Sequence, residues 1–85
     1  MTNTQYQLLD ELYFVTSFAT LAKESGLQTG ELADELQNLW AMGWVRVYFP
    51  NPDTEVLFQN QPVSPELSNC YFLASKAGLL AHNSQ

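Results

Sequence analysis

Gln37 and Asn38 are the side chains of this sequence whose chemistry best suits contact with a DNA base. A carboxamide can form two hydrogen bonds with the edge of adenine in the major groove. Both residues fall on the outward side of a helix expected over residues 29–42, because leucines at helical spacing mark its inward side. These leucines are Leu32, Leu36 and Leu39. Arg46 follows on an expected strand and could contact DNA backbone, so Gln37, Asn38 and Arg46 are the candidates for DNA contact.

The charge of the chain opposes binding to DNA. Nine acidic residues outnumber three cations and leave a net charge of −6. The cations are Lys23, Arg46 and Lys76, and the other outward positions of the helix are Gly30, Asp34 and Ala41. Lys and Arg contacts with phosphates supply most non-specific affinity for DNA, so this composition disfavours a nucleic-acid partner.

Residues that could carry catalysis or bind a metal are few. His82 is the single histidine and falls in an expected frayed C-terminus, and no acid is placed to orient it toward Ser75. Cys70 is the single cysteine, which rules out an intrachain disulfide, and its apolar surroundings indicate a small core residue. The acidic pairs at 10–11 and 34–35 are adjacent, unlike the spaced ligands of a calcium loop. We therefore expect no catalytic residue, metal, cofactor or small-molecule substrate.

Hydrophobic periodicity predicts the helices that position these residues. A first helix is expected over about residues 4–14. Ser17 can cap a second helix, and Gly26 can end it in the left-handed conformation. The third helix, 29–42, has Gln28 or Thr29 as its N-cap, of which Thr29 is chemically the better, and Gly43 ends it.

Alternation of residue types predicts three strands and a last helix. The strands are expected at 44–49, 54–59 and 70–74. Pro50 and Pro52 make 50–53 a turn, and the stretch 60–69 has the composition of a loop. Ser75 can cap a short final helix, "KAGLLAH".

This order of elements resembles the winged helix-turn-helix domain of MarR-like and PadR-like bacterial regulators. Residues 18–47, "FATLAKESGLQTGELADELQNLWAMGWVRV", are similar to the helix-turn-helix and first wing strand of that superfamily. "FLASKAG" resembles its strand-into-last-helix element, with Phe72, Ser75 and Gly78 in place of the usual Tyr, Thr and Gly. The resemblance covers roughly residues 5–82.

The resemblance implies an α+β fold with a three-helix core, a small antiparallel sheet with a long wing, and a short C-terminal helix. It implies one domain over residues 1–85, with the helix-turn-helix at about 17–43 and the wing at about 44–74. It also implies that the helix at 29–42 is the one that contacts base edges. The net negative charge of the chain would make it a divergent member of that superfamily.

The predicted sheet offers a second kind of site. Val45, Val47 and Phe49 share one face of their strand, so Trp44, Arg46 and Tyr48 share the other. If the first face packs on the helices, the second leaves an apolar surface in water. Its expected members are Trp44, Tyr48, Leu57, Tyr71 and Leu73. A small domain rarely exposes such a patch unless a partner or its own 50–69 segment covers it.

These observations predict a non-enzymatic winged-helix module for protein interaction and regulation, either a homodimer or bound to another protein. The alternative is a DNA-binding transcriptional regulator that uses the helix at 29–42 and the wing. A third hypothesis is an acidic decoy that imitates DNA, which requires the acidic residues to line one surface.

Length and composition agree with a small folded domain. The chain has 85 residues, of which 46% are apolar and 14% are charged. The charged fraction is low against a typical value of about 25%, as expected if part of the surface is hidden by a partner. No signal peptide is evident, and the apolar stretch "LYFVTSFATLA" is too short to span a bilayer. We therefore expect a cytoplasmic protein without a membrane partner.

Overall fold

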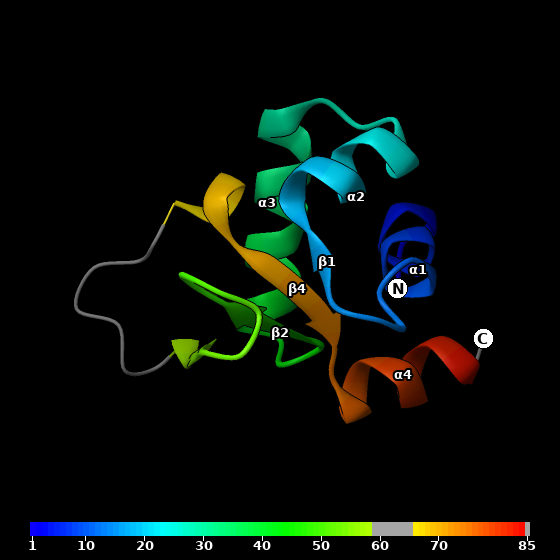
Figure 1. Cartoon of the computed structure of the whole chain (residues 1–85). Helices are drawn as coiled ribbons and strands as arrows, with labels where there is room; N and C mark the ends of the chain where they lie inside the picture. The colour runs from blue at the N-terminus through cyan, green and yellow to red at the C-terminus, as the bar shows by residue number, and fades with distance from the viewer. Residues whose placement is uncertain (59–65, 85) are drawn as a thin grey trace.

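The computed structural model of the chain describes residues 1–58 and 66–84, which form short helices around a small sheet (Figure 1). The elements follow in the order α1 (Asn3–Asp10), β1 (Thr16–Ser17), α2 (Phe18–Ser25), α3 (Thr29–Ala41), β2 (Val45–Tyr48), β3 (Glu55–Val56), the 3₁₀ helix η2 (Leu67–Asn69), β4 (Tyr71–Ala74) and α4 (Lys76–Asn83). This is the predicted α+β winged-helix architecture, with one additional strand, β1. No helix among the described residues is long and apolar enough to cross a membrane.

The first helix is shorter than predicted. Thr2 and Gln5 form a reciprocal capping box at its start, and the helix ends at Asp10 instead of continuing to residue 14. Leu12 remains buried, but its backbone carbonyl accepts a hydrogen bond from Ala74 of β4. The chain leaves the helix so that Thr16 and Ser17 can pair with β4, and this tertiary pairing overrides the helical spacing.

Local signals correctly predicted the start of α2 and the ends of α2 and α3. Ser17 accepts a hydrogen bond from Thr20 N–H at the start of α2, as expected of an N-cap. Gly26 and Gly43 follow the ends of α2 and α3 with φ of 74° and 76°, the left-handed conformation that glycine adopts readily. The N-cap of α3 is Gln28, without a side-chain hydrogen bond, so the preference for Thr29 was wrong.

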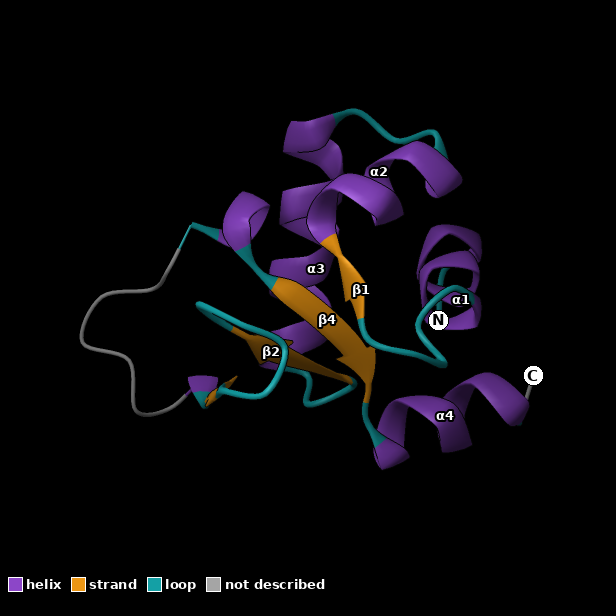
Figure 2. Cartoon of the chain, in the orientation of Figure 1, coloured by secondary structure: helices purple, strands orange, loops and turns teal. Residues whose placement is uncertain are grey.

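The sheet is antiparallel, with the strand order β1-β4-β2-β3 (Figure 2). Strand β1 was missed because two residues are too few for alternation to be visible, and their pairing partner is far away in sequence. Strand β3 covers only Glu55 and Val56 of the predicted 54–59. Val47 lies in register with Phe72 on one side and Val56 on the other. These three side chains belong to the inner face of the sheet and are buried in the core.

The last helix is fixed to the turn that follows α3. Ser75 accepts a hydrogen bond from Gly78 N–H as the N-cap of α4, and its hydroxyl donates to the carbonyl of Gly43 at 2.6 Å. Gly78 is buried against the backbone of Trp44, where an added Cβ would overlap the Trp44 carbonyl oxygen. Ser75 and Gly78 therefore hold the start of α4 against the turn between α3 and β2.

Candidate interaction site on helix α3 and the wing

The outer face of α3 is exposed, acidic and free of cations. Gly30, Asp34, Asn38 and Ala41 are exposed as predicted, and Glu31 is exposed beside them in the first turns. Gln37, a candidate for base contact, is half-buried. An amide and two carboxylates therefore occupy the face that would meet DNA.

Arg46, the cation nearest to this helix in sequence, is engaged in an ion pair. Its Nε and Nη2 donate to the two carboxylate oxygens of Glu55 on the neighbouring strand, at 3.0 and 2.6 Å. These hydrogen bonds raise the pKa of Arg46 and hold the pKa of Glu55 below its ordinary value. The positive charge of Arg46 is thus matched within the chain, which weakens its attraction for phosphate.

The outer face of the sheet is less open than predicted. Tyr48 is only 8% exposed, so its expected place on an open patch was wrong. It lies on the central strand β2, in register with Tyr71 on one side and Glu55 on the other. Trp44 is half-buried and packs against the core, and Tyr71 and Leu73 are also half-buried. Of the five predicted interface residues only Leu57 is largely exposed, at 52%.

A more open apolar surface lies where the end of α3 meets the wing, the β2–β3 hairpin. We call it the wing hollow. Its lining includes Trp40, Met42, Arg46, Glu55, Leu57 and Phe58, around a volume of about 450 Å³. The rings of Trp40 and Phe58 meet edge to face with centroids 4.9 Å apart. Met42, Leu57 and Phe58 remain 45, 52 and 41% exposed. The sequence analysis did not include Met42 or Phe58 among the interface candidates. The signal available for Met42 was its place at the end of a helix, directly before Gly43.

Comparison with solved structures agrees with this architecture. The chain is similar to the "Multiple Antibiotic Resistance Repressor, MarR", with a TM-score of 0.72, 20% identity, and coverage of 99% of this chain and 53% of that one. The fold is a winged helix of the MarR type. The chain spans about half the length of that repressor. No family model and no curated protein matches the sequence.

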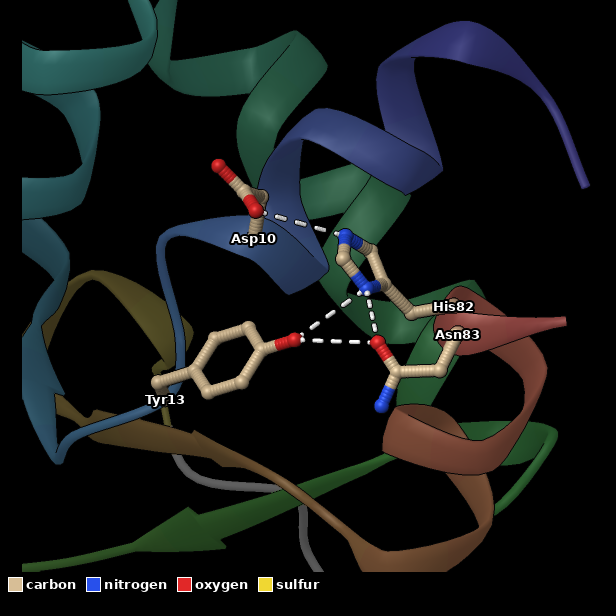
Figure 3. Close-up of polar contacts among 4 residues, drawn as sticks. All are labelled: Asp10, Tyr13, His82 and Asn83. Atoms are coloured by element: carbon tan, nitrogen blue, oxygen red, sulfur yellow. Dashed lines mark hydrogen bonds and ion pairs between the residues drawn. The ribbon is translucent and has the colours of Figure 1, made fainter. Parts of the chain in front are cut away.

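At the other end of this winged helix, His82 ties α4 to α1 (Figure 3). His82 is 5% exposed and lies within α4, so the expectation of a frayed end was wrong. Its ring stacks on Tyr6 with centroids 4.2 Å apart. Its Nδ1 lies 3.3 Å from the Tyr13 hydroxyl, and its Nε2 lies 3.4 Å from a carboxylate oxygen of Asp10. The helix packing that buries His82 joins residues far apart in sequence, which no local signal could indicate.

The other candidate groups of the winged helix do not form a reactive centre. The Ser75 hydroxyl caps α4 and bonds Gly43, at the opposite end of that helix from His82. Cys70 is 1% exposed, and burial raises the pKa of its thiol to about 11. The described residues contain no group of three or more His, Cys, Asp or Glu side chains placed to hold a metal ion.

The acidic residues occupy separate regions. Asp10, Glu11 and Glu24 line a polar hollow between α1 and α2. The pKa of Glu11 is raised, chiefly because its carboxyl group interacts by a hydrogen bond with the carboxyl group of Glu24. Asp53 lies in the turn between β2 and β3 and is not part of that hollow. This distribution does not provide the single acidic surface that a DNA decoy requires.

Proposed function

We propose that this winged helix is a non-enzymatic regulatory module that acts by contact with another protein through the wing hollow. The observation that carries the proposal is the gathering of three exposed apolar side chains, Met42, Leu57 and Phe58, around one hollow. Apolar side chains that gather on the surface of a small protein mark interaction sites far more often than side chains scattered singly. The likeness to a protein named as a repressor supports a regulatory role.

The polar side chains around α3 favour a protein partner over DNA. The exposed face of that helix presents Glu31, Asp34 and Asn38, and Arg46 is already paired with Glu55. A DNA complex would need cations at these positions to displace counterions from the phosphates. DNA binding stays the second candidate because the fold presents Asn38, an amide that suits adenine, on the exposed face of its helix-turn-helix.

Fluorescence anisotropy of a labelled random-sequence duplex, titrated with the protein in about 50 mM salt, separates the two candidates. Binders driven by phosphate contacts show non-specific dissociation constants of about 10⁻⁴ to 10⁻⁶ M even at physiological salt. We expect no binding in that range. Binding that weakens as salt is added would replace the proposed function by the DNA-binding one.

Site-specific photo-cross-linking tests the protein contact directly. A benzoylphenylalanine at Phe58 should give one discrete protein adduct in an extract of the native cells, and unlabelled wild-type protein should compete it away. The same group at Leu80, which is 61% exposed on α4, is the matched control and should give none. An adduct with twice the 9.6 kDa mass of the chain identifies a homodimer. Equal adducts at both positions, or none at Phe58, would contradict the proposal.

A further inference from the structure

The outer face of α3 leads from two acids directly to the wing hollow. Glu31, Asp34, Asn38 and Met42 follow at spacings of three and four residues, which places them on one side of the helix. Met42 is also part of the wall of the hollow. At 1.5 Å per residue, Asp34 lies about 12 Å along the helix from Met42. One continuous surface therefore has carboxylates at one end and exposed apolar side chains at the other.

These two carboxylates lack cationic partners within residues 1–58 and 66–84. The ion pair in that part of the chain joins Arg46 to Glu55, and the close approach of His82 to Asp10 also leaves Glu31 and Asp34 out. A second copy of the chain is poorly matched to this surface, because it would bring nine acids and three cations toward it. The complementary occupant is a different protein that supplies positive charge.

Resting on the proposed function, we infer that the partner presents a basic amphipathic segment to this surface. A large apolar side chain of the segment fills the wing hollow beside Leu57 and Phe58. Its Lys or Arg side chains lie about two and three helical turns away, against Asp34 and Glu31. The apolar anchor supplies most of the affinity and the charges supply register, the usual division between the buried centre and the polar rim of an interface.

Labelled synthetic peptides test the two parts of this chemistry separately. The probe is a helical peptide that carries Phe and Leu and, about two and three turns later, Lys and Arg. One matched peptide replaces the cations with Glu, and another replaces Phe and Leu with Ser. We expect the basic apolar peptide to bind and the other two to bind at least about tenfold more weakly, because one loses the rim charges and the other loses the anchor.

Variants of the protein locate the bound peptide. E31Q/D34N should weaken binding about fivefold, an effect that disappears in high salt because exposed charges are screened. The matched control E11Q/E24Q removes the same charge from the hollow between α1 and α2 and should bind like wild type. Leu57→Ser should weaken binding about tenfold, through lost apolar contact.

Three outcomes overturn the inference: no binding of the basic apolar peptide at high micromolar protein, equal binding of the basic and acidic peptides, or equal effects of E31Q/D34N and E11Q/E24Q. None of them affects the cross-link at Phe58, which depends on proximity and not on the partner's charge. Failure of the peptide chemistry and failure of the proposed protein contact are therefore distinguishable.

Discussion

The two ends of this molecule differ in the contacts that their aromatic residues make, although both ends expose apolar side chains, among them Phe14 and Leu80 at 82 and 61%. At the α1–α4 end, Tyr6 stacks on His82, and the Tyr13 hydroxyl bonds Asn83 and contacts His82. At the wing end, Phe58 meets Trp40, and Leu57 and Met42 are 52 and 45% exposed beside them. A high aromatic content therefore does not by itself indicate a partner. What matters is whether the matching groups lie within the same chain.

Gly78→Ala should have the largest effect on the free energy of unfolding, because it removes the close contact that seats α4. The added methyl group overlaps the Trp44 carbonyl oxygen, so the helix must move away from the α3–β2 turn. We expect a loss of about 3 kcal/mol, measured by urea denaturation. Gly30→Ala is the control: it has open space around it, and it should leave stability unchanged or raise it by up to about 1 kcal/mol. Equal effects of the two changes would contradict the packing account.

His82→Ala should lower the free energy of unfolding by weakening the packing of α4 against α1. It deletes the ring that stacks on Tyr6 and contacts Tyr13. We expect a loss of about 2 kcal/mol, less than for a buried Phe→Ala change because part of the lost contact is polar. Leu80→Ala, at a 61% exposed position on the same helix, should change stability by less than about 0.5 kcal/mol. A stable His82→Ala variant would show that the aromatic cluster does not hold the helices together.

At the wing end, Glu55→Gln removes the ion pair with Arg46 and should lower the free energy of unfolding by less than His82→Ala does. Both partners of the Arg46–Glu55 pair are partly exposed and screened by solvent, so we expect a loss below about 1 kcal/mol near neutral pH. Because the pKa of Glu55 lies below its ordinary value of 4.5, the stabilisation is present above that value and is lost as the pH falls through the lower, folded-state pKa. Urea denaturation at neutral and acidic pH checks this sign.

The control for this change is Asp53→Asn, an exposed acid in the turn of the same wing. It should match wild type at both pH values. A difference between Glu55→Gln and wild type that persists in acid would mean that the amide disturbs the strand, and the ion pair would then not be the cause.

Leu57→Ser should leave the free energy of unfolding within about 0.5 kcal/mol of wild type, since the side chain is already 52% exposed. Its neighbour Val56 is 9% exposed and belongs to the core, so Val56→Ser should cost about 2 kcal/mol. Thermal denaturation of the pair checks the contrast. If Leu57→Ser proved as destabilising as Val56→Ser, Leu57 would be a core residue and the wing end would not be free for a partner.

Local chemistry made much of the fold predictable from sequence. Ser17 and Ser75 cap helices, and Gly26 and Gly43 end them, because each of these effects depends on residues within one turn. Strand β1 was not predictable in this way: it exists because Thr16 lies opposite Phe72, and nothing near it in sequence indicates that pairing.

The candidate site was harder to predict than the fold because it depends on register across strands. Alternation correctly separated Val47 from Arg46, but it could not indicate that Glu55 would meet Arg46 or that Tyr48 would be enclosed. The Arg46–Glu55 pair follows from how the wing hairpin aligns its strands. Leu57 was predicted as an exposed candidate, and its exposure agrees; its role in binding stays a prediction.

The hydroxyl of Ser75 joins two helices that are remote in sequence. It accepts from Gly78 N–H within α4 and donates to the Gly43 carbonyl just beyond α3. A displacement of the end of α3, such as a side chain wedged beside Met42 would impose, must either carry α4 with it or break this 2.6 Å hydrogen bond. These two hydrogen bonds of Ser75 couple the position of α4 to the position of the α3 end. Through α4 they link the wall of the wing hollow to the packing of His82 against α1.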